Sequence, residues 1–402
     1  MQPIEIKPGI FYVGVNDEKT ELFDGLWPIM NEGVSYNSYL IQDEKTAIVE
    51  LTKDFKTDDL FNNIREIIDP TKIDYVIINH MEPDHTGAML AIRHINPNVT
   101  LVGSEKTKAL LSSFYGIDQN IKVVQEGETL QLGKHTLQFY STPNVHWPET
   151  MMTYEVNHKV LFSCDGFGGF GKLGEGIFDD NCSNLGYYEQ EANRYFSNIV
   201  VSFSKPVLAA ISKLSDLSID MVAPSHGLIW RKDPRRIIGL YEKWSRYAKG
   251  EHESGITFLY GSMYHNTEKM AQAVMEGIHK TGIQMKSFNV STNHCSYILP
   301  SLIAFFGVVI GAPTYEGRLY PAMTQVLDMA TFKHLSGKKA IYFGSFGWGG
   351  GALRQLTEKM EMMNWELSDS LEFIGCPTPD NLQSGKMMGE KFAKLLSEKY
   401  RN

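Results

Sequence analysis

Four apolar segments in the C-terminal part of the chain constrain its fold more than any other feature. They cover residues 256–261, 303–311, 339–345 and 371–376, and stretches with a helical pattern separate them. Uninterrupted apolar strands that alternate with helices are typical of a parallel sheet covered on both faces. We therefore predict a doubly wound α/β unit here, with ligands binding at the carboxyl ends of its strands.

The rest of the chain follows a different pattern. A length of 402 residues is enough for two domains. The first part alternates short strands with a few helices in two blocks, which favours two packed sheets with helices outside them. The polar segment 249–254 is a plausible linker. We predict an N-terminal domain of residues 1–251 and a C-terminal domain of residues 252–402.

Composition narrows the class of protein. Apolar residues make up 43% and charged residues 21%, and the net charge is −9, which disfavours nucleic acid and anionic membranes as partners. No N-terminal signal segment is apparent, and the longest apolar run, residues 302–312, is shorter than the ~20 residues that cross a bilayer. We expect that run to be a buried strand and the protein to be cytoplasmic.

Cysteine spacing excludes one kind of metal site. The four cysteines form no CxxC pair, which excludes a rubredoxin-type or zinc-ribbon site and gives no disulfide framework; they are Cys164, Cys182, Cys295 and Cys376. This usage suits a reducing compartment.

The segment "NHMEPDHTG", residues 79–87, follows the apolar run 75–78 and contains His80, Glu82, Asp84 and His85. One of these residues could have a local structural role, since Asp84 could cap the following helix. Burying two histidines and two carboxylates together is costly unless they are paired or bind metal. The segment therefore predicts a metal site.

Three more residues of ligand type follow predicted strands. His146 comes after the strand 136–140, Asp165 after 160–163 and His226 after 221–223. Alone, each histidine could be an ordinary hydrogen-bonded residue, and Asp165 a turn former. Because loops at strand ends on a rigid scaffold are where sites are built, we expect all seven residues to bind metal together.

Three loops of the C-terminal domain predict a second site. Segment 261–267 is a strand end, a polar loop and a helix start, an arrangement that favours a phosphate group. Segments 310–321 and 343–352 close the next two apolar strands, and the second is rich in glycine with Phe346 and Trp348 interleaved. Glycines allow a ring to approach the backbone, and aromatic residues can stack on it.

The alternatives here are helix caps for the Ser and Thr residues and a mobile loop for the glycines. A GxGxxG motif is absent at the first strand, which argues against NAD. The candidate cofactor-binding residues are Ser262, Met263, Tyr264, Asn266, Thr267, Pro313, Thr314, Tyr315, Gly317, Ser345, Phe346, Gly347, Trp348, Gly349 and Gly350.

With these motifs the chain resembles flavodiiron proteins. The resemblance implies an N-terminal αββα sandwich of the metallo-β-lactamase fold, fused to a flavodoxin-like doubly wound parallel sheet that binds FMN. It also implies how the seven residues share two irons: His80, Glu82 and His146 on one, Asp84, His85 and His226 on the other, and Asp165 bridging both.

Two positions distinguish this chain from related folds. Glu82 stands where most metal hydrolases of the fold carry a histidine, and mixed imidazole and carboxylate ligation suits iron rather than zinc. His265 stands where flavodoxins usually have a glycine. Its surroundings, "SMYHNTEKMA", instead resemble the flavodoxin-like half of flavodiiron proteins.

The resemblance implies a reductase of dioxygen to water, of nitric oxide to nitrous oxide, or of both. Dioxygen needs four electrons, of which two ferrous ions give two and reduced flavin gives two. Without a rubredoxin segment, the electrons would come from a separate rubredoxin-like protein or a reduced deazaflavin. A head-to-tail homodimer, or a dimer of dimers, is also implied.

Other hypotheses stay open at this point. A zinc-dependent hydrolase with a regulatory flavodoxin domain is the main alternative, and an electron carrier with a structural metal is another. Asp24 stands where several relatives carry a histidine, which could alter hydrogen bonding near the metals. Segment 166–176 could be a substrate-access loop or a flexible surface insert, and no proton donor is identifiable.

Overall fold

The computed structural model describes residues 2–399 and divides after Ser245 into two compact units. The division lies in helix α7 (Pro234–Tyr247), and strand β17 (Glu253–Tyr260) is the first strand of the second unit. The predicted boundary between residues 251 and 252 falls between these two elements.

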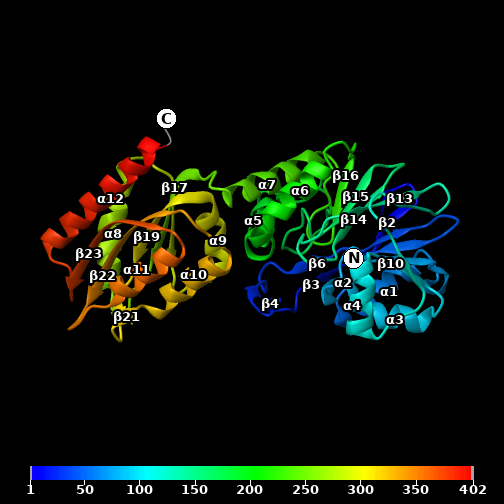
Figure 1. Cartoon of the computed structure of the whole chain (residues 1–402), viewed down its shortest axis with the longest axis horizontal. Coiled ribbons are helices and arrows are strands. Elements are labelled where there is room, and N and C mark those ends of the chain that lie inside the picture. Colours follow the sequence, from blue (N-terminus) through cyan, green and yellow to red (C-terminus); the bar gives the residue numbers. More distant parts are fainter. Residues whose placement is uncertain (1, 400–402) are drawn as a thin grey trace. The chain divides into compact units, whose positions relative to one another are not determined.

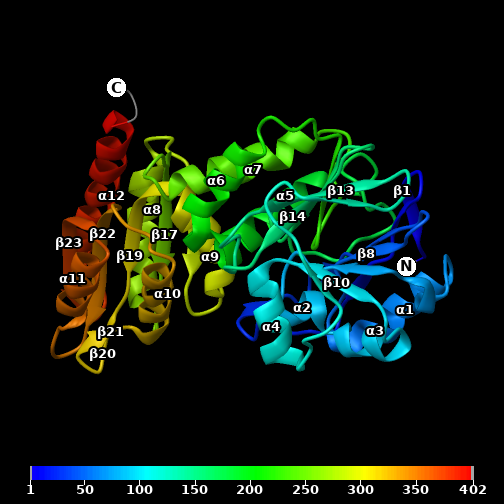
Figure 2. The ribbon, with the colours of Figure 1, turned by 45° about the vertical axis from the view of Figure 1, so that its right-hand side comes forward.

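The first unit contains two main sheets, with helices α1–α4 on one side and α5–α7 on the other (Figures 1 and 2). This arrangement is the αββα sandwich that the sequence predicted. The seven-stranded sheet has the order β1 (Ile4–Lys7), β2 (Ile10–Tyr12), β7 (Tyr39–Ile41), β8 (Ala47–Val49), β9 (Tyr75–Ile77), β10 (Thr100–Gly103) and β11 (Ile121–Val123). The five-stranded sheet has the order β12 (Thr129–Gln131), β13 (Thr136–Ser141), β14 (Met151–Glu155), β15 (Val160–Cys164) and β16 (Met221–Pro224).

Parallel pairing within these sheets gathers the candidate metal ligands. Strands β8 and β9 run parallel, with Val49 beside Ile77, so the residues that follow both strands meet at one edge. Strands β15 and β16 also run parallel, with Cys164 beside Pro224, which brings together the loops that carry Asp165 and His226. Two short pairs, β3 (Val15–Asp17) with β6 (Val34–Tyr36) and β4 (Leu22–Phe23) with β5 (Trp27–Pro28), lie outside the main sheets.

The helices of the first unit include two that are short or irregular. The short helix α2 (Pro83–Thr86) precedes α3 (Met89–Ile95), and α5 (Leu185–Tyr195) continues as a π-helical turn over 196–200 and a 3-10 turn over 201–203. A π-helical turn inside a helix is often found at functional sites. The remaining helices are α1 (Thr57–Arg65), α4 (Glu105–Tyr115) and α6 (Ser204–Lys213).

The second unit is a five-stranded parallel sheet in the order β18 (Met285–Asn289), β17, β19 (Phe305–Gly311), β22 (Lys339–Phe346) and β23 (Glu366–Ile374). This is the flavodoxin-like strand order, and its switch point lies at β17 and β19. Helices α8 (Asn266–His279) and α12 (Pro379–Lys399) pack on each other, and buried side chains of both join the strands in one apolar core. The other elements are α9 (Cys295–Ala304), α10 (Pro321–Phe332), α11 (Ala352–Met362) and the hairpin β20 (Thr314–Tyr315) and β21 (Arg318–Leu319).

In this unit one strand was missed and two predicted boundaries were wrong, each for a physical reason. Strand β18 was missed because it lies at the sheet edge and its sequence, "MKSFN", is mostly polar. The apolar run 302–312 is only partly a strand, because residues up to Ala304 end helix α9. Strand β23 begins at Glu366 rather than residue 371, since its first residues are polar on the exposed side.

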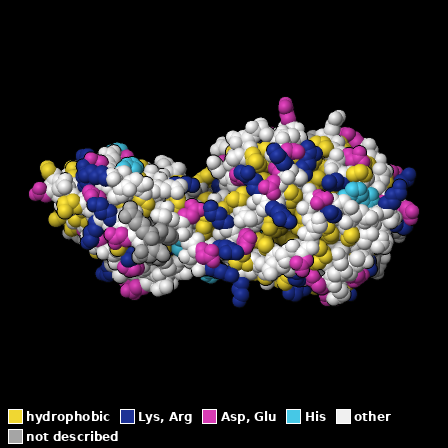
Figure 3. All heavy atoms as spheres, turned by 90° about the horizontal axis from the view of Figure 1, so that it is seen from above, with side chains coloured by type: hydrophobic (Ala, Val, Ile, Leu, Met, Phe, Trp, Pro, Cys, Tyr) yellow, Lys and Arg dark blue, Asp and Glu magenta, His cyan; other side chains and the backbone are white. Residues whose placement is uncertain are grey.

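On the face that Figure 3 shows, acidic and basic side chains are interspersed rather than gathered into a field of one sign.

Candidate metal centre and flavin site

The structure brings the seven candidate metal ligands together from four loops. His80 and Glu82 follow β9, and Asp84 and His85 lie in the short helix α2 that comes next. His146 lies in the loop between β13 and β14, Asp165 directly follows β15, and His226 comes two residues after β16. Six of the seven residues are buried and Glu82 is partly buried.

His80, Glu82, His146 and Asp165 form one cluster, whose potential ligand atoms lie within 4.8 Å of one another. The Oε2 atom of Glu82 lies 3.2 Å from His80 Nε2 and 3.1 Å from His146 Nε2. Asp165 Oδ2 lies 3.4 Å and 3.2 Å from the same two nitrogens. Two imidazole nitrogens and two carboxylates therefore face one point.

Asp84, His85 and His226 form a second cluster beside the first. The Oδ1 and Oδ2 atoms of Asp84 lie 3.5 Å from His85 Nε2 and 3.3 Å from His226 Nε2, respectively. Asp165 Oδ1 lies 3.1 Å from His85 Nε2 and 3.3 Å from His226 Nε2. The two oxygens of Asp165 thus face different clusters, as a bridging ligand requires.

Charges in this region are strongly coupled. Burial raises the pKa of Glu82, but hydrogen bonds from His146 and His80 outweigh burial and lower that pKa to about 2. Burial lowers the pKa of His146, but the nearby carboxylates of Asp165 and Glu82 raise it to about 10. Burial also opposes the charge of Asp165, yet the nearby imidazoles of His85, His146 and His226 hold its pKa well below the usual range. Glu82 and Asp165 are therefore ionised, and metal cations would replace the imidazole protons.

Several buried polar atoms at the centre have no hydrogen-bond partner, which tests whether metals fit. These atoms are Asp84 Oδ1, His85 Nε2, His226 Nε2 and both carboxylate oxygens of Asp165. Orphaned buried polar atoms are rare in folded proteins and need a partner. Cations between the clusters would supply that partner, and the mixed nitrogen and oxygen donors suit iron.

Sequence reasoning missed the groups that hold the other imidazole nitrogens. His80 Nδ1 lies 2.7 Å from Glu149, His85 Nδ1 lies 3.0 Å from Glu50, and His226 Nδ1 donates to the Ser35 carbonyl at 2.8 Å. Glu50 directly follows the apolar strand β8, as Asp165 directly follows β15, and that signal could have identified it.

Aromatic residues that the sequence did not single out surround the second cluster. The rings of Phe23, Tyr36 and Tyr195 lie 5.7 Å from the ring of His226. Tyr195 is buried at the end of α5, and its hydroxyl lies close enough to Asp165 for that carboxylate to raise its pKa, in addition to burial. These rings shield the centre from water.

The structure locates Asp24 and the glycine-rich segment 166–176, whose roles the sequence left open. Asp24 lies at the exposed tip of the β4–β5 hairpin, where partial desolvation and the negative charges of Glu82 and Asp84 raise its pKa to about 7. Residues 166–171 are buried, so this part of the glycine-rich segment is not a surface insert. Gly169 N donates to the His226 carbonyl at 3.2 Å, and a side chain at Gly227 would collide with Gly169. The segment packs against the His226 loop.

The candidate flavin residues lie at the carboxyl ends of β17, β19 and β22. The loop after β17 holds Ser262, Met263 and Tyr264, and helix α8 begins with Asn266 and Thr267. Pro313, Thr314, Tyr315 and Gly317 lie in and around the β20–β21 hairpin, Ser345 and Phe346 end β22, and Gly347, Trp348, Gly349 and Gly350 follow.

Hydrogen bonds connect these three loops. Thr267 Oγ1 lies 2.9 Å from Ser345 Oγ, and Ala352 N donates to Thr314 Oγ1 at 3.3 Å. Ser262 Oγ is buried with no hydrogen-bond partner, as a phosphate-binding hydroxyl would be before its ligand arrives. Added side-chain atoms at Gly347 and Gly349 would meet open space. The loops therefore fit a flavin mononucleotide.

His265 adopts a left-handed backbone conformation, with φ of 63°. Glycine reaches this region without strain, which explains why flavodoxins usually have glycine at this position. The side chain of His265 is exposed and pairs with Glu268 at 2.6 Å.

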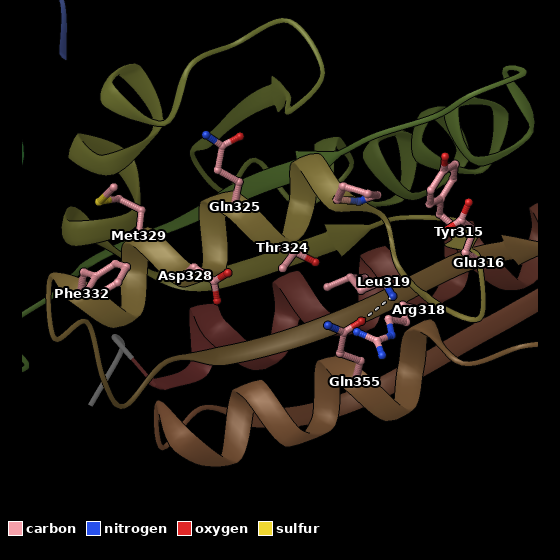
Figure 4. A pocket seen from close by; sticks show the side chains of 11 residues that line it. Tyr315, Glu316, Arg318, Leu319, Thr324, Gln325, Asp328, Met329, Phe332 and Gln355 are labelled. Atoms are coloured by element: carbon pink, nitrogen blue, oxygen red, sulfur yellow. Dashed lines mark hydrogen bonds between the residues drawn. The ribbon is translucent and has the colours of Figure 1, made fainter. Parts of the chain in front are cut away.

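A groove of about 770 Å³ lies between the β20–β21 hairpin and helix α10 (Figure 4). Gln355 of α11 accepts a hydrogen bond from Leu319 N at 2.8 Å, which fixes the hairpin to that helix. Tyr315 and Phe332 contribute aromatic surface to its lining.

Comparisons with known families agree with both halves of this description. Residues 34–227 match the ODP family beta lactamase, and residues 258–383 match the flavodoxin family. The N-terminal match contains all seven candidate metal ligands, and the C-terminal match contains all the candidate flavin residues.

Similar proteins extend over the whole chain. The nitric oxide reductase of Moorella thermoacetica is 32% identical, covering 99% of this chain and 100% of the relative. The anaerobic nitric oxide reductase flavorubredoxin of Vibrio vulnificus is 34% identical over 98% of this chain and 80% of its own length.

Two solved structures share the fold from end to end. Rubredoxin oxygen:oxidoreductase of Desulfovibrio gigas superposes with a TM-score of 0.93 at 29% identity, covering all of both chains. The flavodiiron protein of Giardia intestinalis superposes with a TM-score of 0.92 at 27% identity, covering 99% of this chain and 97% of its own. This chain belongs to the flavodiiron protein family.

Proposed function

We propose that this protein is an oxidoreductase that reduces dioxygen to water, nitric oxide to nitrous oxide, or both. The observation that carries the proposal is the position of Asp165, whose two oxygens face two separate clusters of imidazole and carboxylate groups. Relatives named for each gas support both substrates, since one is called a nitric oxide reductase and another an oxygen:oxidoreductase.

The chain's own residues would hold the two irons in a fixed and unequal way. His80, Glu82 and His146 would hold the first iron and Asp84, His85 and His226 the second, and Asp165 would contribute one oxygen to each. When bound, two ferrous ions and one reduced flavin supply the four electrons that convert dioxygen to water.

Residues around the centre would control access and proton supply. Burial of His226 among Phe23, Tyr36 and Tyr195 keeps bulk water from the second half of the centre. The Tyr195 hydroxyl stays protonated, because burial and the nearby Asp165 raise its pKa well above the usual range. It can therefore donate a hydrogen bond to a molecule bound beside Asp165.

Electrons would enter through the flavin. We infer an external donor, either a rubredoxin-like protein or a reduced deazaflavin. We also propose that residues 252–402 form the flavin domain and residues 1–251 the metal domain. The flavin loops carry unusually exposed aromatic side chains, since Tyr264 is 82% exposed and Trp348 is fully exposed. A head-to-tail homodimer, or a dimer of such dimers, would cover them and place each flavin near its partner's irons.

We also propose a cytoplasmic location and no role for nucleic acid or membrane. The net charge of −9 supports the absence of a polyanionic partner. Within residues 2–399, no helix has the length and apolar character needed to cross a membrane.

Gas consumption with a chosen donor tests the proposal. Reduced rubredoxin is supplied anaerobically, and dioxygen and nitric oxide are followed with electrodes while nitrous oxide is measured by gas chromatography. We expect at least one gas to be consumed, without oxygen being regained on adding catalase. Ester hydrolysis with no gas consumption would instead support a zinc hydrolase, although none of the relatives named above is a hydrolase.

A further inference from the structure

Two buried glutamates form hydrogen bonds with segment 79–87, which carries four of the seven candidate ligands. Glu50 Oε1 accepts a hydrogen bond from Asn79 N at 2.8 Å, and Glu50 Oε2 lies 3.0 Å from His85 Nδ1. Glu149 Oε1 accepts from Met81 N at 3.0 Å and lies 2.7 Å from His80 Nδ1. Each glutamate is 2% exposed and contacts one backbone N–H and one imidazole of the same segment.

These contacts decide which imidazole nitrogen is free. A carboxylate oxygen that faces a ring nitrogen accepts its hydrogen bond, so Nδ1 of each histidine carries the proton. The Nε2 atoms of His80 and His85 are then the nitrogens available to metal, and both point to the clusters around Asp165. A carboxylate behind a ligating histidine also raises the basicity of that ligand.

We propose that Glu50 and Glu149 are positioning residues that hold His85 and His80, respectively, in the metal-binding tautomer, and that their charges favour the ferric state. This inference rests on the ligand assignment in the proposed function. It assigns one buried carboxylate to each half of the centre: Glu149 to the half with Glu82, and Glu50 to the half with Asp84.

The two glutamates use their carboxylate oxygens differently. Substitutions can therefore test separately the hydrogen-bond geometry at Glu50 and the negative charge at Glu149. Glu50 uses both oxygens, one for the backbone and one for His85. Glu149 uses only Oε1 for both contacts, and its Oε2 is buried without a hydrogen-bond partner. Glutamine has one accepting oxygen and one donating NH₂ group, so the same substitution has different consequences at the two positions.

At position 50, glutamine cannot keep both contacts. If its oxygen accepts from Asn79, its NH₂ group faces His85 and selects the tautomer with the proton on Nε2, which cannot bind metal. If its oxygen faces His85, the NH₂ group opposes the Asn79 N–H. We expect E50Q to weaken metal binding in the half with Asp84, His85 and His226 by roughly 10- to 100-fold, the usual effect of losing such a partner.

At position 149, glutamine can keep both contacts through its oxygen. The substitution then removes a negative charge while leaving His80 in place. Buried charges are poorly screened, so losing a negative charge near the irons disfavours their ferric state. We expect E149Q to keep two irons per chain and to show a more positive midpoint potential for the iron centre.

A matched control comes from a third buried glutamate of the same unit. Glu155 accepts from the backbone N–H groups of Asn157 and His158 and lies 3.2 Å from His158 Nδ1, but it contacts none of the candidate ligands. E155Q thus removes a buried carboxylate that also faces an imidazole. We expect it to match the unsubstituted protein in iron content and midpoint potential.

The test uses the full chain loaded with iron and FMN. Iron per chain is measured during titration with a competing chelator, the midpoint potential by anaerobic spectroelectrochemistry, and FMN content serves as the check that the protein is folded. Loss of one iron in E50Q, a positive shift in E149Q and neither change in E155Q support the proposal. Unchanged iron affinity in E50Q, an unchanged potential in E149Q, or the same losses in E155Q would overturn it.

If E50Q does not accumulate as folded protein, E50D replaces it. The shorter carboxylate cannot reach both Asn79 and His85, so the same partial loss of iron is expected, and full iron affinity would contradict the proposal. These readouts do not involve gas reduction. A protein that binds two irons in the predicted way but reduces neither gas would refute the proposed function and leave this inference intact.

Discussion

Replacement of Asp165 by asparagine removes the group that joins the two halves of the centre. In the unsubstituted chain, its oxygens lie 3.1–3.4 Å from the Nε2 atoms of His80, His85, His146 and His226. Asparagine keeps one accepting oxygen and presents an NH₂ group to the other half. We expect D165N to bind one iron per chain instead of two, because an NH₂ group cannot act as a ligand.

The size of the effect can be worked out for the metal-free protein. Removing one partner of a buried ion pair destabilises a protein by about 3–5 kcal/mol. For a unit of this length, each kcal/mol lowers the unfolding midpoint by roughly 2–4 °C. The metal-free first unit of D165N should therefore unfold roughly 6–20 °C below the unsubstituted one.

The sign of the pH dependence follows from the histidines. Burial lowers their pKa values, but the surrounding carboxylates raise them to about 10 for His146 and about 9 for His226. Because these values lie above the ~6.5 of an unfolded chain, the stabilisation is complete below pH ~6.5 and is lost as pH rises through 9 to 10. The difference between D165N and the unsubstituted protein should be large at pH 6 and small at pH 10.

Calorimetry of the chelated protein at both pH values measures this difference, and elemental analysis measures the bound iron. The control is D43N, because the Asp43 side chain is only 7% exposed and also lies beside an imidazole, 2.8 Å from His135 Nδ1, but outside the centre. D43N should keep two irons. Equal midpoints for D165N and the unsubstituted protein at pH 6, or two irons bound by D165N, would refute the bridging assignment.

Three further substitutions test separate parts of the account. E82H should shift the centre toward zinc and abolish gas reduction, and retained iron with full activity, measured by elemental analysis and gas electrodes, would contradict the role given to Glu82. H265G should change the free energy of unfolding of the flavin unit by less than about 1 kcal/mol, because relief of the left-handed conformation offsets the greater freedom of glycine in the unfolded chain. The variant should still bind FMN, and loss of FMN would refute this reasoning. Burial lowers the pKa of Lys338 to about 7, so the second unit of the unsubstituted protein gains stability as pH rises from about 7 toward the unfolded value of ~10.5. K338M should remove this gain and flatten the pH dependence of unfolding. An unchanged slope in the variant would count against the buried position of the Lys338 charge.

The candidate ligands were predictable because their position in the fold follows from the strand pattern. Each follows a strand. Strands β9, β15 and β16 have parallel neighbours, and β13, which precedes His146, points the same way as β15 because both are antiparallel to β14. Glu149 could not be predicted this way, since it lies in the loop beyond His146 and reaches His80 only through the tertiary fold. The orientation of Asp165, with one oxygen toward each cluster, also depends on packing that no spacing reveals.

The fold was less predictable in segments whose amino-acid composition does not match their burial in the structure. The glycine-rich segment suggested flexibility, yet Phe167 and Phe170 anchor it in the core beside the His226 loop. Strand β18 carries too few apolar residues to be recognised, because an edge strand needs to bury only part of its surface. In both cases the deciding contacts come from segments distant in sequence.

The most direct test of the central claim combines composition with a single turnover. Iron and FMN are quantified per chain, the protein is reduced anaerobically, and it is mixed rapidly with dioxygen or nitric oxide while the flavin spectrum is recorded. We predict two irons and one FMN per chain and reoxidation of the flavin by at least one gas. Two zinc ions per chain, or a fully reduced protein that consumes neither gas, would contradict the account.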